Sequence, residues 1–313
     1  MSAFTPNPEQ ITAAIGPFVH QRWPKDDPEF QRRTTGLAHR WRRRKLHRGV
    51  FGWLPSGAHL PRLLRGRRDQ NYVRESYPTT WSQQDWPNAD GTPNERELSL
   101  AIWRGEGPNV RRGGLARGHM PAIAAAIELL KPTTVLEVGA GMGLNLFTLS
   151  ARFPEITWTG IELTEAGVAR AQSVQKEAAL PSVIADYCPR EVADPQAYRR
   201  IDFQQGDATK LPFDDNTFDL VFTRQALEQM EAVRDPALAE ISRVAKGHVL
   251  MVEPFADFNK SALNRNFVAA KDYFSLPVAE LDRFGITPAV TYDDFPQKLT
   301  LGQGLVVGKT GQM

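Results

Sequence analysis

Residues 135–145 read Val-Leu-Glu-Val-Gly-Ala-Gly-Met-Gly-Leu-Asn, and this stretch decides the fold. An apolar run, typical of a buried strand, leads directly into three alternating glycines and then into a helical pattern. Glycine adopts positive φ values and lacks the Cβ atom that would keep a ligand away from the backbone. The free N–H groups at the start of the following helix add hydrogen-bond donors. The stretch predicts a site where a polar or anionic ligand approaches the backbone, but the glycines alone name no reaction.

The sequence after residue 118 predicts alternating helices and strands. Helices are expected at 120–130, at 144–153, after a Thr164 N-cap, and from an Asp235-Pro236 start to Gly247. Strands are expected at 133–138, 156–162, 201–205, 218–223 and 248–253. This alternation is typical of right-handed βαβ units and of a parallel sheet covered by helices on both faces. Residues 289–292 and 301–308 have no helix between them and predict an antiparallel pair at the end of the sheet.

The first 118 residues differ from the rest in charge and composition. They contain 20 Lys and Arg against 11 Asp and Glu, whereas the remainder contains 18 against 25. Six of the seven tryptophans also lie in this front part, which is rich in Pro, Gly and Arg and shows little sustained periodicity. We therefore predict a basic, irregular or helical region at 1–118 on the substrate or partner side, and an α/β domain at 119–313.

The composition argues against several classes of protein. The single cysteine, Cys188, allows no intrachain disulfide and no thiolate cluster for zinc. The longest apolar run, 122–130, is interrupted by Glu128 and is far shorter than the roughly 20 residues of a membrane-spanning helix. The first residues have no secretory-signal pattern. Asp214 and Asp215 fit a solvated turn, so no metal site is expected. These features predict a cytoplasmic protein without a transmembrane segment.

Taken together, the motifs after residue 120 resemble those of the class I S-adenosylmethionine-dependent methyltransferases, in the group that modifies small molecules. The matching pieces are the glycine stretch, Glu162 at the end of the second strand, Gly-Asp-Ala at 206–208, Leu-Pro-Phe-Asp-Asp-Asn-Thr-Phe-Asp-Leu-Val at 211–221, and Val-Glu-Pro at 252–254. The resemblance covers about residues 120–308. It implies a Rossmann-like, doubly wound and mostly parallel sheet that ends in an antiparallel hairpin, with S-adenosylmethionine as the cofactor.

The order of these motifs also has a chemical reason, because ligands of open α/β sheets lie across the carboxyl ends of the strands. Glu137 is expected to orient the glycine turn or to meet the ammonium group, Glu162 to accept the ribose hydroxyls, and Asp207 to accept the adenine amino group. The alternatives are that Glu162 caps the helix behind Thr164 and that Asp207 only forms a turn. The cofactor-binding positions that the resemblance implies are Glu137, Gly139, Gly141, Gly143, Asn145, Glu162, Leu163, Asp207, Ala208 and Thr223.

The segment 223–230, after the fourth strand, is expected to face the methyl acceptor. The family often has Leu-Glu-His here, but Gln229 stands at the position of the histidine and cannot take a proton at neutral pH. The predicted catalytic residues are Gln229, Glu228 and Glu253, although helix capping explains Glu253 equally well. His119 is interpreted as a surface histidine.

Several functions stay open. A nicotinamide dehydrogenase also uses a glycine turn, but here Leu144 occupies the place of its last glycine. The leading hypothesis is methyl transfer to O, N or C of a small metabolite. A second is methylation of RNA or protein through residues 20–68, which carry 14 Lys and Arg against three acids, with tryptophans that can stack on bases; nucleic acid is the less favoured partner. A third is a non-catalytic module that binds the cofactor. The oligomeric state is not predicted.

Overall fold

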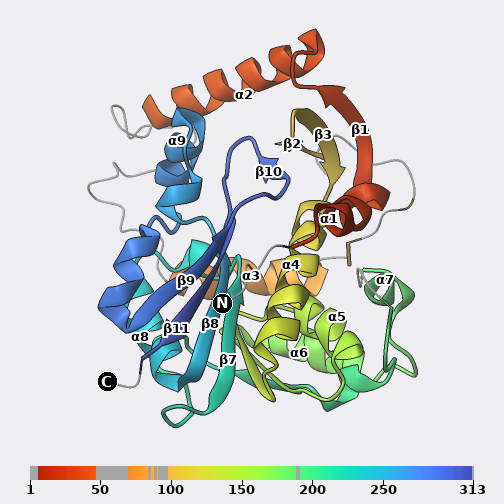
Figure 1. The fold of residues 1–313 in the computed structure, drawn as a ribbon, viewed down its shortest axis with the longest axis vertical. Helices are drawn as coiled ribbons and strands as arrows, with labels where there is room; N and C mark the ends of the chain where they lie inside the picture. Colours follow the sequence, from red (N-terminus) through yellow and green to blue (C-terminus); the bar gives the residue numbers. More distant parts are fainter. Residues whose placement is uncertain are drawn as a thin grey trace.

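The computed structural model describes residues 6–46, 70–83, 86–87, 90, 98–187 and 191–311 (Figure 1). Cys188 and residues 47–68 of the basic stretch, which include Trp53, lie outside the described residues.

A seven-stranded sheet forms the centre of the molecule, in the order β6-β5-β4-β7-β8-β11-β9 (Figure 1). Its strands are β4 (Thr134–Val138), β5 (Thr157–Glu162), β6 (Asp202–Gln205), β7 (Phe218–Arg224), β8 (Ala245–Glu253), β9 (Ile286–Tyr292) and β11 (Gly304–Thr310). The neighbours from β6 to β8 pair in parallel, whereas β11 pairs antiparallel with both β8 and β9. This confirms the predicted mostly parallel sheet with an antiparallel end.

Helices cover both faces of this sheet, because successive side chains of a buried strand point to opposite sides. Val135 of β4 belongs to a core with α4 (Gly114–Leu130), α5 (Leu144–Arg152) and α6 (Glu165–Gln175). Its neighbour Leu136 belongs to a second core, with α8 (Arg234–Val244) and the 3-10 helix η6 (Val278–Phe284). Each continuously apolar strand therefore packs side chains into both hydrophobic cores, one on each face of the sheet.

Two helix boundaries differ from the prediction. α4 begins at Gly114, after Gly113 at φ +84°, and not near Met120. The predicted domain boundary at 118/119 consequently falls inside one continuous helix. α8 ends at Val244, since parallel pairing with β7 extends β8 back to Ala245, so Gly247 lies within a strand and does not end the helix.

The front part is more regular than its sequence suggests. It contains α1 (Pro8–Ile15), β1 (Val19–Pro24), α2 (Pro28–Leu46), α3 (Gln70–Gln83), β2 (Leu98–Ile102) and β3 (Glu106–Arg111). The three strands form a small antiparallel sheet that is completed by β10 (Gln297–Lys298) from the far end of the chain. α1 packs on α4, and α2 lies beside α9 (Ala262–Lys271) (Figure 1). Of the predicted irregular or helical structure, the described residues show the helical form, together with three strands that the sequence analysis did not expect.

Two sets of contacts join the front to the rest. The guanidinium of Arg117 in α4 donates hydrogen bonds to the carbonyl oxygens of Ala14, Asp186 and Tyr187. Trp41 of α2 packs edge-on against Phe267 of α9, with ring centroids 4.6 Å apart. Within the described part of the chain, no helix has the length and apolar character needed to cross a bilayer.

Candidate functional site

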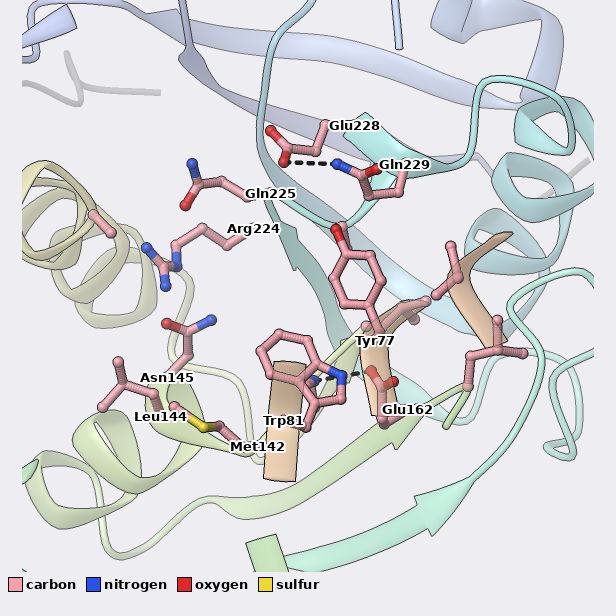
Figure 2. Close-up of a pocket in the computed structure, with 18 of the residues that line it drawn as sticks. Tyr77, Trp81, Met142, Leu144, Asn145, Glu162, Arg224, Gln225, Glu228 and Gln229 are labelled. Carbon is pink, nitrogen blue, oxygen red and sulfur yellow. Dashed lines mark hydrogen bonds between the residues drawn. The ribbon is translucent and has the colours of Figure 1, made fainter. Parts of the chain in front are cut away.

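A cavity of about 440 Å³ lies at the carboxyl ends of β4, β5, β6 and β7 (Figure 2). This is the edge at which ligands bind to open α/β sheets. Six of the predicted cofactor-binding residues line it: Gly139, Gly141, Asn145, Glu162, Leu163 and Ala208. The other four, Glu137, Gly143, Asp207 and Thr223, are not among the residues that line it. Gln229 and Glu228 line the same cavity, whereas Glu253 does not.

The glycine turn forms one wall of the cavity through its backbone. Gly139 and Gly141 have φ values of +79° and +56°. A Cβ atom at Gly139 would come within 2.5 Å of the Ala226 Cβ, so this turn packs directly against the segment after β7. The third glycine has a different role, because a Cβ atom at Gly143 would meet the rings of Phe203 and Phe147. Gly143 therefore serves packing between α5 and the sheet.

Glu162 connects the glycine turn with the start of α6. Its Oε2 accepts a hydrogen bond of 3.0 Å from the N–H of Gly141, and its Oε1 accepts from the N–H and the hydroxyl of Thr164. Thr164 is the N-cap of α6, as predicted, and its hydroxyl accepts from the N–H of Gly167. Glu162 thus organises the start of the helix and also lines the cavity, so both interpretations of this residue fit the same geometry.

Glu137 and Asn145 form a buried polar pair beside the turn. The amide nitrogen of Asn145 donates a hydrogen bond of 2.5 Å to Oε1 of Glu137. Burial raises the pKa of Glu137 to about 7. Glu137 Oε2 and Asn145 Oδ1 are buried without a hydrogen-bond partner among the described residues. Two unsatisfied acceptors next to the cavity are suited to a cationic donor, since an unpaired buried acceptor is costly.

Asp207 is already engaged by the front part of the chain. Its carboxylate accepts hydrogen bonds from the side chain of Gln70 at 2.5 Å and from Thr209 at 2.8 and 2.9 Å, and it lies 3.4 Å from Arg74. Burial raises the pKa of Asp207, but these hydrogen bonds and the charge of Arg74 outweigh burial and lower it below its usual value. Asp207 therefore forms the expected turn and also anchors α3.

α3 supplies a wall of the cavity that the sequence analysis missed. Tyr77 and Trp81 lie in front of the glycine turn, next to Glu162 (Figure 2). A Cβ atom at Gly141 would be 3.2 Å from the indole of Trp81, whose Nε1 is buried without a partner among the described residues. The positions 70, 74, 77 and 81 follow the i, i+4, i+7, i+11 spacing of one helix face. That spacing is the signal that could have found this helix.

The predicted catalytic residues occupy two different places. The side chain of Gln229 donates to Oε1 of Glu228 over 3.0 Å, and both residues face the cavity (Figure 2). Glu253 is fully buried behind them, and its carboxylate accepts from the N–H groups of Ala226, Leu227 and Glu228 at 3.0 to 3.2 Å. Burial raises the pKa of Glu253 to about 8. Its contacts fix the turn that carries Gln229, whereas the capping alternative from the sequence concerned the segment that begins at Pro254.

His119 is not a surface residue, contrary to the sequence-based interpretation. It lies inside α4 with 1% of its surface exposed, and its ring meets Phe295 edge-on at 4.8 Å between centroids. Burial, aided by the charges of Arg224 and Lys298, lowers the pKa of His119 to about 3. It does not line the cavity.

The described residues contain no group of three or more His, Cys, Asp or Glu side chains placed to hold a metal ion. Asp215 forms an ion pair of 2.8 Å with Arg243 in the turn before β7.

Comparison with known proteins shows a partial match to methyltransferases. Residues 136–252 match a family model described as a methyltransferase domain. An uncharacterised methyltransferase of Bacillus subtilis is 32% identical over 39% of this chain and 41% of its own length. A fatty-acid O-methyltransferase of Mycolicibacterium smegmatis is 27% identical over 49% of this chain and 46% of its own length. The chain thus spans less than half the length of these curated relatives.

A solved structure supports the fold. Magnesium protoporphyrin IX methyltransferase from Synechocystis PCC 6803, crystallised with S-adenosylhomocysteine, superposes with a TM-score of 0.53 at 13% identity, over 78% of this chain and all of that one. At this identity the likeness concerns the fold alone. Residues 136–252 thus match a methyltransferase domain in sequence, and the strand order, the glycine turn and this superposition give the chain the fold of such a domain.

Proposed function

We propose that the protein uses S-adenosylmethionine to methylate O, N or C of a small molecule. The observation that carries the proposal is that one cavity joins the glycine turn and Glu162 to Gln225, Glu228 and Gln229. Cofactor-binding and acceptor-facing positions of the domain therefore share one space, as direct transfer between two bound molecules requires.

The residues at the sheet edge fit this cofactor. The turn at Gly139 and Gly141 leaves backbone open for the methionyl end, and Asn145 Oδ1, unsatisfied and buried at the cavity, suits its ammonium group. Glu162 would hold the ribose, and Ala208 would lie beside the adenine. Asp207 would share the adenine end with Gln70, which already contacts it and lines the cavity.

The protein's own contribution to the reaction is chiefly to align the acceptor with the cofactor and to enclose both in the cavity. The cofactor supplies a methyl carbon that its sulfonium already activates. Proximity and orientation of an acceptor against such a carbon supply about 7–11 kcal/mol. Gln229, held by Glu228, would orient the acceptor by hydrogen bonds, and Tyr77 and Trp81 would keep water out on the side of α3. Glu228 is the carboxylate on the acceptor wall and is placed to take a proton where an acceptor must lose one.

The described tryptophans favour a small acceptor over nucleic acid. Trp23 is buried, Trp41 packs on α9, Trp86 meets Phe147 edge-on, and the Trp103 Nε1 donates to Asp294 over 2.8 Å. These rings are therefore engaged inside the protein and are not free to stack on bases. Among the tryptophans that the structure describes, Trp81 alone lines the cavity.

Isothermal titration of the full chain with S-adenosylmethionine, S-adenosylhomocysteine and NADH tests the cofactor. We expect one site for the first two ligands and none for NADH. Asp207→Ala should weaken S-adenosylhomocysteine binding by about tenfold, since it removes an acceptor and releases Gln70. The matched control is Asp202→Ala, on the exposed start of β6. Absence of heat with both sulfur ligands would contradict the proposal; unchanged affinity of Asp207→Ala would contradict only the placement of the adenine.

A further inference from the structure

Arg224, at the end of β7, is a cation that the proposed reaction does not yet use. Its guanidinium extends into the cavity between Asn145 and Gln225 (Figure 2). Its Nε and Nη1 atoms are buried and have no hydrogen-bond partner among the described residues. Because an arginine side chain carries a positive charge at physiological pH, its buried N–H groups remain donors that need an acceptor.

The carboxylates around Arg224 are engaged elsewhere. Glu162 accepts from Gly141 and Thr164, and Glu137 accepts from Asn145. Glu228 accepts from Gln229. Within the described ranges none of these acids forms an ion pair with Arg224. The phenol of Tyr187 is a hydrogen-bond partner of the Arg224 guanidinium, but it carries no charge. A buried cation without a carboxylate partner is unfavourable, so the position is suited to an anionic ligand.

The rest of this wall is also cationic. Arg111, Arg112 and Lys298 line the same cavity. Among its lining residues, four cationic side chains thus stand against the two carboxylates of Glu162 and Glu228. The unpaired N–H groups of a guanidinium bind carboxylate oxygens through charge-assisted hydrogen bonds, which are stronger than those between neutral groups.

We propose that Arg224 is the carboxylate-binding residue of this cavity. The proposal rests on the proposed function, because two molecules of that reaction can carry the carboxylate: the methionyl end of the cofactor, or an acceptor that is an organic acid. The first source would make Arg224 a determinant of cofactor affinity. The second would define the class of acceptor.

Two variants and two ligand pairs separate these sources. Arg224→Met removes the charge at similar length, Arg224→Lys keeps it without the planar fork, and Arg40→Met on the exposed part of α2 is the control. The first pair is S-adenosylhomocysteine and 5′-methylthioadenosine, which lacks the amino-acid end. The second pair is benzoate and benzamide, followed by octanoate and octanamide, each titrated into protein saturated with S-adenosylhomocysteine. Circular dichroism and thermal unfolding verify that each variant is folded.

The affinities decide between the outcomes. If the cofactor supplies the carboxylate, Arg224→Met weakens the binding of S-adenosylhomocysteine by about tenfold to a hundredfold and leaves the affinity for 5′-methylthioadenosine unchanged. Arg224→Lys then recovers part of the lost affinity. If the acceptor supplies it, S-adenosylhomocysteine is unaffected, and an acid binds the wild type better than its amide but does not bind Arg224→Met. Unchanged S-adenosylhomocysteine affinity together with no preference for an acid over its amide overturns the proposal. Wild-type protein that binds neither nucleoside contradicts the proposed function itself.

Discussion

At the residue scale, the site depends on a few buried polar side chains that hold backbone in place. Glu253 shows this most clearly, since one carboxylate satisfies three N–H groups of the turn at 226–228. That turn packs against Gly139 through Ala226 and carries Glu228 and Gln229 into the cavity. A residue outside the cavity therefore sets the geometry within it.

Removal of the Glu253 carboxylate should destabilise the protein. Glu253→Ala leaves three buried N–H groups without an acceptor, and each unsatisfied donor costs about 1–3 kcal/mol. We expect the free energy of unfolding in urea to fall by at least about 3 kcal/mol. Glu280→Ala, which breaks the exposed pair with Arg283, is the control and should change it by less than about 1 kcal/mol. Equal effects of the two substitutions would contradict the capping role.

His119 should make the protein sensitive to acid. Its pKa is about 3 in the folded state, whereas an unfolded chain restores a value near 6.5, so the unfolded state binds more protons between these pH values. Stability should therefore fall as the pH drops from about 6.5 toward 3, by up to about 1.4 kcal/mol per pH unit from this residue. His119→Leu should flatten that part of the dependence, measured as unfolding free energy between pH 4 and 7. Parallel curves for the two proteins would show that His119 binds protons equally in the folded and unfolded states, which contradicts the lowered pKa.

At the element scale, α3 is the helix that turns a sheet edge into an enclosed cavity. Gln70 and Arg74 fix one part of it to Asp207, and Tyr77 and Trp81 place aromatic rings, 5.4 Å apart between centroids, over the glycine turn. The sheet supplies the positions that contact the ligand, and α3 supplies the cover. The site is therefore built both from the basic front part of the chain, which supplies α3, and from the acidic remainder, which supplies the sheet.

The cover should contribute to cofactor affinity. Trp81→Ala removes the ring above Gly141. The Kd for S-adenosylhomocysteine should therefore rise by about tenfold, because one aromatic stacking contact contributes roughly 1–3 kcal/mol. Trp86→Ala, whose ring packs on Phe147 and not over Gly141, is the control. Tighter binding to Trp81→Ala would mean that α3 competes with the cofactor and does not cover it.

At the scale of the whole molecule, the predictable part is the part that local patterns encode. The strands from β4 to β8, the Thr164 cap and the antiparallel end follow from apolar runs and turn residues that lie close together in sequence. The pairing of β10 with β2 and the hydrogen bond between Gln70 and Asp207 join segments more than a hundred residues apart, so no local pattern announces them. The burial of His119 depends likewise on Phe295, far along the chain. Motifs thus predicted eight residues of the cavity wall, six for the cofactor and two for the acceptor, but the wall from α3 required the structure.

The central claim is that the cofactor lies on the backbone of the glycine turn, and the affinity of Gly141→Ala for S-adenosylhomocysteine tests it most directly. Gly141 has φ +56°, and a Cβ atom there would lie 3.2 Å from the Trp81 indole. Gly36 in α2 has open space where a Cβ atom would lie, so Gly36→Ala is the control. We predict that Gly141→Ala raises the Kd at least about tenfold while Gly36→Ala leaves it unchanged. Equal affinity of both folded variants and the wild type would contradict the claim.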